Sequence, residues 1–195
     1  MGELLSKKKD YSSIVLAGEA GQGIQTVEYI LTRVLKLSGY NIFSSKEFMS
    51  RIRGGTNSTE IRISSKRVSA FVDGIDILIP LSKDAVHHVK KRVSPNTIVL
   101  GEKENFRKEY KGSKDNIIDI PLSRIASDVG SRVYVNTVAV GLICGLFRVE
   151  PEILENFLKK HFLAKGENII QKNIEAGKKG YEIGSDLVTS GKIEV

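Results

Sequence analysis

A short apolar run leads directly into a glycine-rich turn near the start of the chain, and this order leaves few folds open. The run Ile14–Ala17 is followed by Gly18-Glu19-Ala20-Gly21-Gln22-Gly23. After the turn, apolar residues recur at the i, i+3, i+4 spacing of one helix face as far as Gly39: Ile24, Val27, Ile30, Leu31, Val34 and Leu35. A second apolar segment follows at 40–43. The pattern predicts a strand, a glycine loop, a helix and a strand, which form a βαβ unit with a right-handed crossover.

The remaining segments alternate between strand-like and helix-like patterns. Further strands are expected at 58–64, 75–81, 97–100 and 116–120. Residues 68–72 are expected to pair with 58–64 as a hairpin, and the polar residues of 58–64 are expected to face solvent. Further helices are expected at 82–92, with Ser82 as its cap, at 136–147, from Pro151 onward, and at 167–179, ending at Gly180. The polar residues 101–115 are expected to form an exposed, mobile loop.

This order of elements predicts an α/β fold: a three-layer α/β/α Rossmann-like domain with a mainly parallel sheet. A hairpin addition and helical C-terminal packing complete the expected fold. The length of 195 residues fits one domain. We place that domain at 11–184, between a charged lead-in at 1–10 and a tail or the start of a linker at 185–195.

Composition excludes several classes of function. Cys144 is the single cysteine, so the chain cannot form an internal disulfide, an iron–sulfur cluster or a cysteine-rich zinc site. The polar N-terminus has no signal-peptide pattern, and no apolar run reaches the roughly 18 residues of a membrane span. We therefore expect a cytoplasmic protein with no membrane partner. The net charge of +7 is spread along the chain, which favours a phosphate-bearing ligand or an acidic partner over nucleic acid.

The glycine loop is the first candidate site, with Gly18, Gly21, Gln22 and Gly23 as its residues. Glycines between a strand and a helix let backbone amides approach a phosphate. The spacing G-x-x-G-x-G reverses the usual dinucleotide motif, and the second strand ends in Ser44-Ser45-Lys46 rather than in an acid. Lys46 suits a phosphate better than a ribose, so a phosphate or another coenzyme ranks above NAD. The alternative, that the glycines only make a tight turn, stays equally open on this motif alone.

A second candidate site carries two arginines followed by two glycines: Ser50, Arg51, Arg53, Gly54, Gly55, Thr56 and Asn57. Arginine recognises phosphates and carboxylates in a bidentate manner, and glycine permits the close approach of a partner. Composition alone favours a solvated surface loop over a partner or ligand loop.

No grouping of residues typical of a catalytic or metal site stands out. His87 and His88 are adjacent on an expected helix and so point to different faces, and His161 ends an apolar stripe. Cys144 lies in an apolar helix, where burial is expected. We therefore expect no catalytic residue and no metal ligand in this chain.

Taken together, the motifs resemble a known family. The segments 14–23 and 50–57 occur in the same order in the gamma domain of the pyruvate and other 2-oxoacid:ferredoxin oxidoreductases. Segments 70–81, 136–141 and 173–181 resemble the same domain, so the likeness covers about 11–183. The residues of these motifs are most similar to those of gamma domains that are fused ahead of an alpha domain, although such domains often have histidine at the position of Thr56. The chain is thus either a free gamma subunit or the first domain of a longer one.

The resemblance implies an enzyme complex that decarboxylates a 2-oxoacid oxidatively with coenzyme A, giving acyl-CoA, CO2 and reduced ferredoxin in anaerobic metabolism, as in pyruvate synthase. It implies alpha and beta partners, with delta in some complexes, and places thiamine diphosphate and iron–sulfur clusters on those partners. This chain would act as a scaffold, bind no cofactor tightly and help to hold coenzyme A, without catalysing alone. Two alternatives remain: a stand-alone dinucleotide-binding oxidoreductase, and a non-enzymatic binding or regulatory module. The 2-oxoacid and the oligomeric state stay open.

Overall fold

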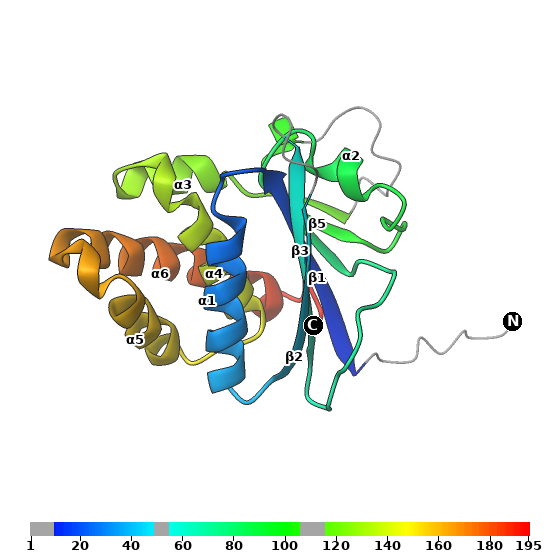
Figure 1. The fold of residues 1–195 in the computed structure, drawn as a ribbon, viewed down its shortest axis with the longest axis horizontal. Helices are drawn as coiled ribbons and strands as arrows, with labels where there is room; N and C mark the ends of the chain where they lie inside the picture. Colours follow the sequence, from blue (N-terminus) through cyan, green and yellow to red (C-terminus); the bar gives the residue numbers. More distant parts are fainter. Residues whose placement is uncertain (1–9, 49–54, 106–115) are drawn as a thin grey trace, which may run out of the picture.

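A twisted six-stranded sheet divides the molecule into two unequal helical layers (Figure 1). The computed structural model describes residues 10–48, 55–105 and 116–195. The strand order in the sheet is β2-β3-β1-β4-β5-β6. The strands are β1 (Tyr11–Glu19), β2 (Asn41–Glu47), β3 (Thr56–Ser64), β4 (Ile77–Pro80), β5 (Ile98–Gly101) and β6 (Ile117–Asp119). The helices are α1 (Ile24–Leu37), α2 (Ala85–Val89), α3 (Leu122–Val129), α4 (Val135–Leu146), α5 (Pro151–His161) and α6 (Glu167–Thr189).

The α/β class with a mainly parallel sheet is confirmed. Strand β1 is parallel to β4, β4 to β5, and β5 to β6. Strand β3 is antiparallel to both β1 and β2 and lies between them. The predicted succession of strand, helix and strand along the chain is confirmed as β1, α1 and β2, but in the sheet β3 separates β2 from β1.

The predicted hairpin between 58–64 and 68–72 is wrong, because β1 and β2 already pair with both edges of β3. Residues 68–72 form no strand, and β3 pairs instead with β2, from Glu47 opposite Ser58 to Asn41 opposite Ser64. Side chains supply the hydrogen bonds that a strand would have made to the backbone of 68–72. Arg62 Nη1 donates to the carbonyl of Ala70 at 3.1 Å, and the amide of Val72 donates to Glu60 Oε1 at 3.4 Å.

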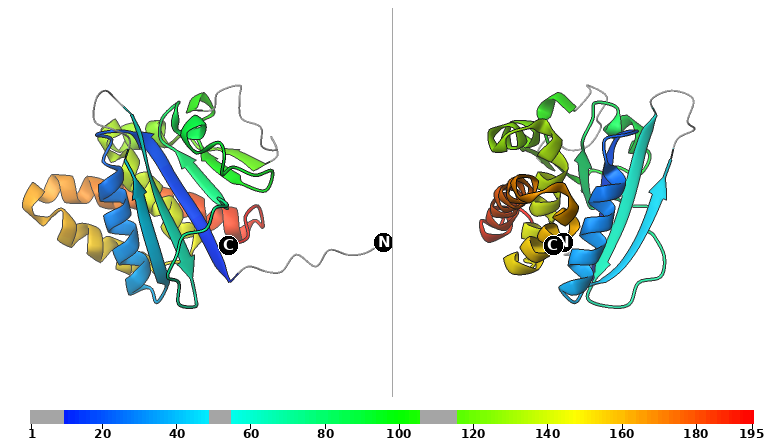
Figure 2. Two further views of the ribbon diagram at one scale, coloured as in Figure 1. Left: turned by 45° about the vertical axis from the view of Figure 1, so that its right-hand side comes forward. Right: turned by 60° about the vertical axis from the view of Figure 1, so that its left-hand side comes forward.

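One face of the sheet carries most of the apolar core. Helices α1 and α4 cover this face, and α3, α5 and α6 pack outside or beside them (Figure 2). Alternate residues of β1, such as Ile14 and Leu16, point into this core. The opposite face has a smaller core of Val15, Leu78 and Val99, covered by the short helix α2. The two helical layers therefore differ greatly in thickness.

Two helices touch through their backbones. A Cβ built on Gly180 would lie 2.0 Å from the carbonyl oxygen of Val138, and one on Gly184 would lie 2.1 Å from that of Leu142. The glycines of α4 face α6 in the same way, because a Cβ on Gly141 would lie 2.0 Å from the carbonyl oxygen of Gly177. The predicted helix end at Gly180 is wrong, because α6 needs that glycine for contact with α4 and continues to Thr189.

The polar side of β3 is buried, contrary to expectation. Glu60 is only 4% exposed, and its Oε2 lies 2.6 Å from Nη2 of Arg92. Ser13 Oγ donates to the other carboxylate oxygen at 3.3 Å. Opposite charge, and not solvent, therefore compensates Glu60 on the α2 side of the sheet.

Three smaller expectations also differ from the structure. The helix expected over 82–92 covers only Ala85–Val89, and Ser82 does not cap it, because Asp84 occupies the N-cap position. Helix α3 was not anticipated. Of the loop expected at 101–115, Gly101 belongs to β5 and 103–105 form a 3-10 turn, while 106–115 lie outside the described residues. None of the helices in the described ranges combines the length and apolarity that a bilayer crossing needs.

Candidate functional site

The glycine loop connects β1 to α1 and depends on its glycines for conformation. Gly21 and Gly23 have φ values of 92° and 77°, in the left-handed region that favours glycine. Gly18 ends the buried part of β1, where an added Cβ would lie 2.5 Å from Oε1 of Gln22. That same Gln22 oxygen accepts a hydrogen bond from the amide of Glu19 at 2.9 Å. The loop thus folds back on its own strand.

The first turn of α1 presents backbone donors to solvent. Gly23 is the N-cap, and no side chain caps the helix. The amides of Thr26 and Val27 bond to the carbonyl of Gly23, whereas those of Ile24 and Gln25 find no acceptor among the described residues. Free amides at a helix N-terminus, together with the helix dipole, favour an anion.

A pocket of about 300 Å³ opens beside this turn. The end of β2 and the start of β3 form its other wall. Its lining includes Gly21, Gly23, Gln25, Lys46, Phe48 and Asn57. The cavity is large enough for a phosphate group and part of the molecule that carries it.

Lys46 lines the pocket but already has a partner. Its Nζ lies 3.0 Å from Oε2 of Glu28, a buried residue of α1, and Ser44 Oγ donates to the other Glu28 oxygen at 2.7 Å. This ion pair offsets much of the positive charge that the sequence suggested for the pocket. Lys46 remains 39% exposed, so its ammonium can also meet a ligand from the solvent side.

Strand pairing brings the two candidate sites together. Glu19 lies opposite Thr56, and Gly18 lies opposite Asn57. The amide of Ala20 donates to the carbonyl of Gly55 at 2.9 Å. Thr56 is buried, and Asn57 lines the pocket. Both motifs therefore contribute to one end of the sheet, while Ser50, Arg51, Arg53 and Gly54 lie outside the described residues.

Strand β2 ends in an acid that sequence reasoning overlooked. Glu47 follows Lys46, and because side chains alternate along a strand, it faces the other side of the sheet. There its Oε2 lies 3.4 Å from His88 Nε2 and 3.5 Å from Ser58 Oγ. Glu47 is not part of the pocket lining. It therefore does not take the place of the acid that holds a ribose in dinucleotide-binding folds.

Asn136 is a further residue at the loop that sequence reasoning did not select as a site. It lies in the first turn of α4, and its Nδ2 donates to the carbonyl of Gln22 at 2.5 Å. The next residue, Thr137, donates through Oγ1 to Oδ1 of Asn173 on α6 at 2.7 Å. The sequence signal for this residue was its place in segment 136–141, which resembles the gamma domain of the same family.

The side chains with the potential for nucleophilic or metal chemistry lie apart. Burial raises the pKa of the Cys144 thiol, which is fully enclosed, so this side chain stays protonated. The His161 ring stacks on Phe157, with ring centroids 6.2 Å apart, and meets Phe162 edge-on at 4.7 Å; burial lowers the pKa of His161. Within the described ranges, no three His, Cys, Asp or Glu side chains are grouped as metal ligands.

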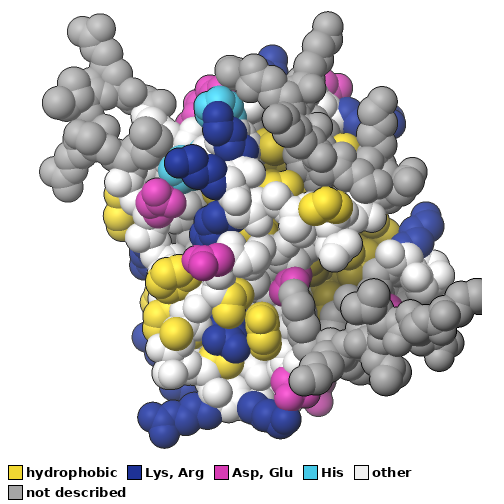
Figure 3. All heavy atoms as spheres, turned by 90° about the vertical axis from the view of Figure 1, so that its right-hand side faces the viewer, with side chains coloured by type: hydrophobic (Ala, Val, Ile, Leu, Met, Phe, Trp, Pro, Cys, Tyr) yellow, Lys and Arg dark blue, Asp and Glu magenta, His cyan; other side chains and the backbone are white. Residues whose placement is uncertain are grey.

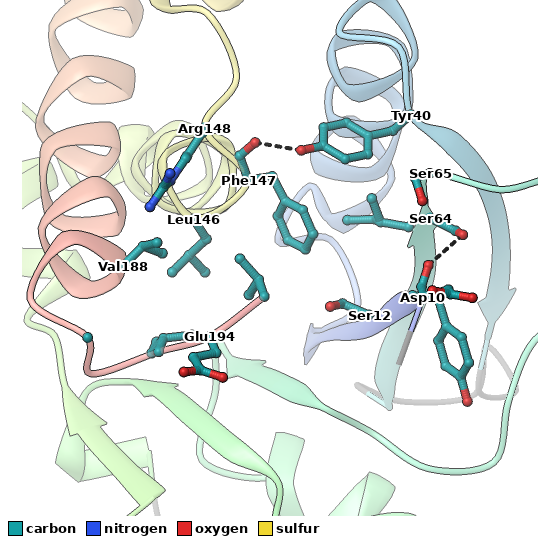
Figure 4. Close-up of a pocket in the computed structure, with 15 residues that line it drawn as sticks. Asp10, Ser12, Tyr40, Ser64, Ser65, Leu146, Phe147, Arg148, Val188 and Glu194 are labelled. Atoms are coloured by element: carbon teal, nitrogen blue, oxygen red, sulfur yellow. Dashed lines mark hydrogen bonds between the residues drawn. The ribbon is translucent and has the colours of Figure 1, made fainter. Parts of the chain in front are cut away.

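A larger cavity of about 620 Å³ lies at the other end of the sheet, between β1, α4 and the end of the chain (Figure 4). Two of its hydroxyls are already engaged by backbone carbonyls. Tyr40 donates to the carbonyl of Phe147 at 2.8 Å, and Ser64 donates to that of Asp10 at 2.7 Å. Burial raises the pKa of Tyr40, and the nearby charge of Arg148 opposes this rise. The first bond joins the end of α4 to the residue before β2, and the second joins β3 to the residue before β1.

Comparison with known proteins gives one consistent family. The family model described as pyruvate ferredoxin/flavodoxin oxidoreductase matches residues 13–183. The chain is 25% identical to indolepyruvate oxidoreductase subunit IorB of Archaeoglobus fulgidus, a match that covers 87% of this chain and 93% of that protein.

Two solved structures share the fold. The gamma subunit of a keto/oxoacid ferredoxin oxidoreductase from Geobacter sulfurreducens superimposes with a TM-score of 0.74 at 22% identity, over 91% of this chain and 98% of that one. The 2-oxoglutarate:ferredoxin oxidoreductase of Magnetococcus marinus, solved with 2-oxoglutarate, coenzyme A and succinyl-CoA bound, superimposes with a TM-score of 0.80 at 26% identity. That match covers 92% of this chain but 32% of the longer chain. With the family model spanning nearly the whole domain, the chain belongs to the pyruvate ferredoxin/flavodoxin oxidoreductase family.

Proposed function

We propose that this chain is the gamma component of a 2-oxoacid:ferredoxin oxidoreductase, which converts a 2-oxoacid and coenzyme A into acyl-CoA and CO2 and reduces ferredoxin. The observation that carries the proposal is the family match over residues 13–183. The likeness to subunit IorB, itself a subunit of an indolepyruvate oxidoreductase, extends over almost the full length of both proteins and supports the proposal. The described ranges hold no group of metal ligands, so the thiamine diphosphate and iron–sulfur chemistry would reside on alpha and beta partners.

Within that complex, the glycine loop would hold the phosphates of coenzyme A. The amides of Ile24 and Gln25, for which the described residues provide no acceptor, would form a shallow anion site together with the left-handed glycines. Gly21, Gly23 and Lys46 would line it, with Lys46 shared between Glu28 and the ligand, while Gly18 and Gln22 would hold the shape of the loop behind them. The Magnetococcus relative, which has coenzyme A bound, makes this ligand the first candidate.

The fold itself disfavours a stand-alone dinucleotide-binding enzyme. In dinucleotide-binding folds, an acid at the end of the strand next to β1 holds the ribose. Here β3 occupies the place next to β1, and Glu47 of β2 faces the opposite side of the sheet. A regulatory module on the same fold would bind coenzyme A or a partner without supporting turnover, so activity of the assembled complex distinguishes it.

A positively charged face is available for acidic partners. Lys and Arg side chains gather beside the histidines on the side of the molecule that carries α2 (Figure 3). Lys83, Lys90 and Lys91 are exposed there. Charge of one sign speeds encounter with an acidic partner more than it tightens the final complex. Arg51 and Arg53 remain predicted docking residues for the alpha and beta components.

Calorimetry with the purified chain tests the ligand assignment. Coenzyme A should release or take up heat on binding, whereas pantetheine, which has no phosphate, should not. NAD serves as the competing ligand, and its binding should be weaker than that of coenzyme A. Tighter binding of NAD would reverse the ranking and favour the dinucleotide alternative.

A further inference from the structure

We infer that Asn136 is a positioning residue for the anion site: it fixes the peptide between Gln22 and Gly23 so that the Gly23 amide points into the pocket. The inference rests on the proposed function of the glycine loop and names a residue outside that loop. Asn136 comes from α4, 114 positions along the chain from Gln22. Its Nδ2 donates to the Gln22 carbonyl at 2.5 Å.

The geometry of a trans peptide carries the argument. The described chain contains no cis peptide bonds, so the carbonyl of Gln22 and the amide of Gly23 point in opposite directions from one plane. When Asn136 holds the carbonyl, the Gly23 amide faces away from Asn136. No described residue accepts a hydrogen bond from this amide, and Gly23 lines the pocket. The amide therefore joins those of Ile24 and Gln25 as a donor for one anion.

The hydrogen bond from Asn136 is needed because the peptide that it holds precedes a glycine. Gly23 has a φ of 77°, and a residue without Cβ passes easily between left-handed and right-handed conformations. Rotation of the Gln22–Gly23 peptide would turn the amide away from the pocket and the carbonyl towards an incoming phosphate. The side chain of Gln22 holds only the start of the loop, through the amide of Glu19. Asn136 is the contact from outside the loop that opposes this rotation.

Asparagine at position 136 adds little to folding stability, so stability alone does not explain why this residue type occurs there. Its Oδ1 is buried and accepts no hydrogen bond from any described residue. An amide whose buried oxygen has no partner among the described residues is a poor stabiliser compared with an apolar side chain of similar size. The space is also tight, because a Cβ on Gly23 would lie 2.7 Å from Asn136 Nδ2. A role in orienting the loop therefore explains this side chain better than a role in stabilising the core.

Two variants of Asn136 and one neighbouring control test the inference. Asn136→Ala removes the donor, and Asn136→Asp keeps the shape but loses the N–H group. Thr137→Val breaks the adjacent bond to Asn173, a buried contact that does not touch the loop. The readouts are the amide resonances and ¹⁵N relaxation of residues 21–25, together with affinities for coenzyme A and inorganic pyrophosphate. Melting temperatures report on the general stability of each variant.

We expect both Asn136 variants to shift and mobilise the Gly23 amide and to bind both ligands up to about tenfold more weakly, as the loss of one oriented hydrogen bond allows. Their melting temperatures should fall by no more than about 4 °C. Thr137→Val should lower the melting temperature at least as much and leave the Gly23 amide and the affinities unchanged.

Two results would overturn the inference: an unchanged Gly23 amide in Asn136→Ala, or the same changes in Thr137→Val. If the wild-type chain binds neither ligand, the coenzyme A assignment fails. In that case, mobilisation of Gly23 in the Asn136 variants alone would still show that Asn136 positions the loop.

Discussion

Gly21 and Gly39 share a left-handed backbone but lie in different surroundings. Their φ values are 92° and 90°, and a Cβ on either would meet nothing within 4 Å. Gly21 lines the pocket, whereas Gly39 follows the C-terminus of α1. Replacing either with valine should cost roughly 1–2 kcal/mol of folding stability, because a side chain disfavours this conformation. Only Gly21→Val should lose the coenzyme A signal.

Urea melts and calorimetry on the two glycine variants give the comparison. Both proteins should unfold cooperatively, with similar losses of stability. If Gly21→Val binds coenzyme A like the wild type, the loop is only structural. If Gly39→Val loses binding as well, the effect comes from general destabilisation.

The ion pair between Glu60 and Arg92 gives a second prediction for single residues. Arg92→Ala would leave the buried carboxylate of Glu60 without its charge partner, which should lower the free energy of unfolding by about 3 kcal/mol or more. Lys103→Ala is the matched control, since its partner Asp119 and its own side chain are well exposed. That change should cost less than about 1 kcal/mol. Equal effects in denaturant melts would contradict the structural role of the buried pair.

At the scale of elements, the contact between α4 and α6 depends on which glycine faces a backbone. A Cβ on Gly180 would meet the Val138 carbonyl at 2.0 Å, whereas the nearest atoms to one on Gly177 belong to side chains, with Leu158 Cδ1 first at 3.0 Å. Gly180→Ala should push the helices apart and cost at least about 2 kcal/mol. Gly177→Ala should change stability by less than about 1 kcal/mol, because the gain in helix propensity offsets the shift of Leu158. Thermal melts compare the two, and a tolerated Gly180→Ala would contradict the close packing.

The local hydrophobic pattern was sufficient to predict most helices and strands, but not which of them pair or pack together. The strand, loop and helix at 14–35 follow directly from hydrophobic spacing, and the structure confirms them. The insertion of β3 between β1 and β2 is a non-local choice that no spacing within one segment encodes. Helix α3 was missed although Leu122, Ala126 and Val129 carry its spacing. Gly180 suggested a helix end because its role, contact with another helix, is visible only in three dimensions.

The sequence proposed the glycine loop and Lys46 as one site, and that assignment stays a prediction. The structure places Gly21, Gly23 and Lys46 at one pocket, whereas Gly18 and Gln22 are not part of its lining. The partners of these residues could not be anticipated, since Glu28 and Asn136 reach the site from positions that only the fold brings close. Glu28 offsets the charge of Lys46 in the pocket, and Asn136 is the residue that we infer to hold the loop in place.

At the scale of the whole molecule, the proposed role is that of a subunit that binds a ligand and partners. The thick helical layer includes the glycine-packed helix pair, and the polar end of the sheet carries the pocket proposed for an anion. The positive net charge of +7 suits assembly with acidic partners. Such a chain should contribute to catalysis only within a complex.

Reconstituted turnover tests this central claim most directly. The chain would be assayed alone, its alpha and beta partners would be assayed without it, and the three would be assayed together. The measurement is reduction of a viologen dye that depends on both a 2-oxoacid and coenzyme A. We expect no activity from the chain alone, little from the partners alone and robust activity from the mixture. Turnover by the chain alone, or full coenzyme A-dependent turnover by the partners without it, would show that the chain is not the gamma component proposed.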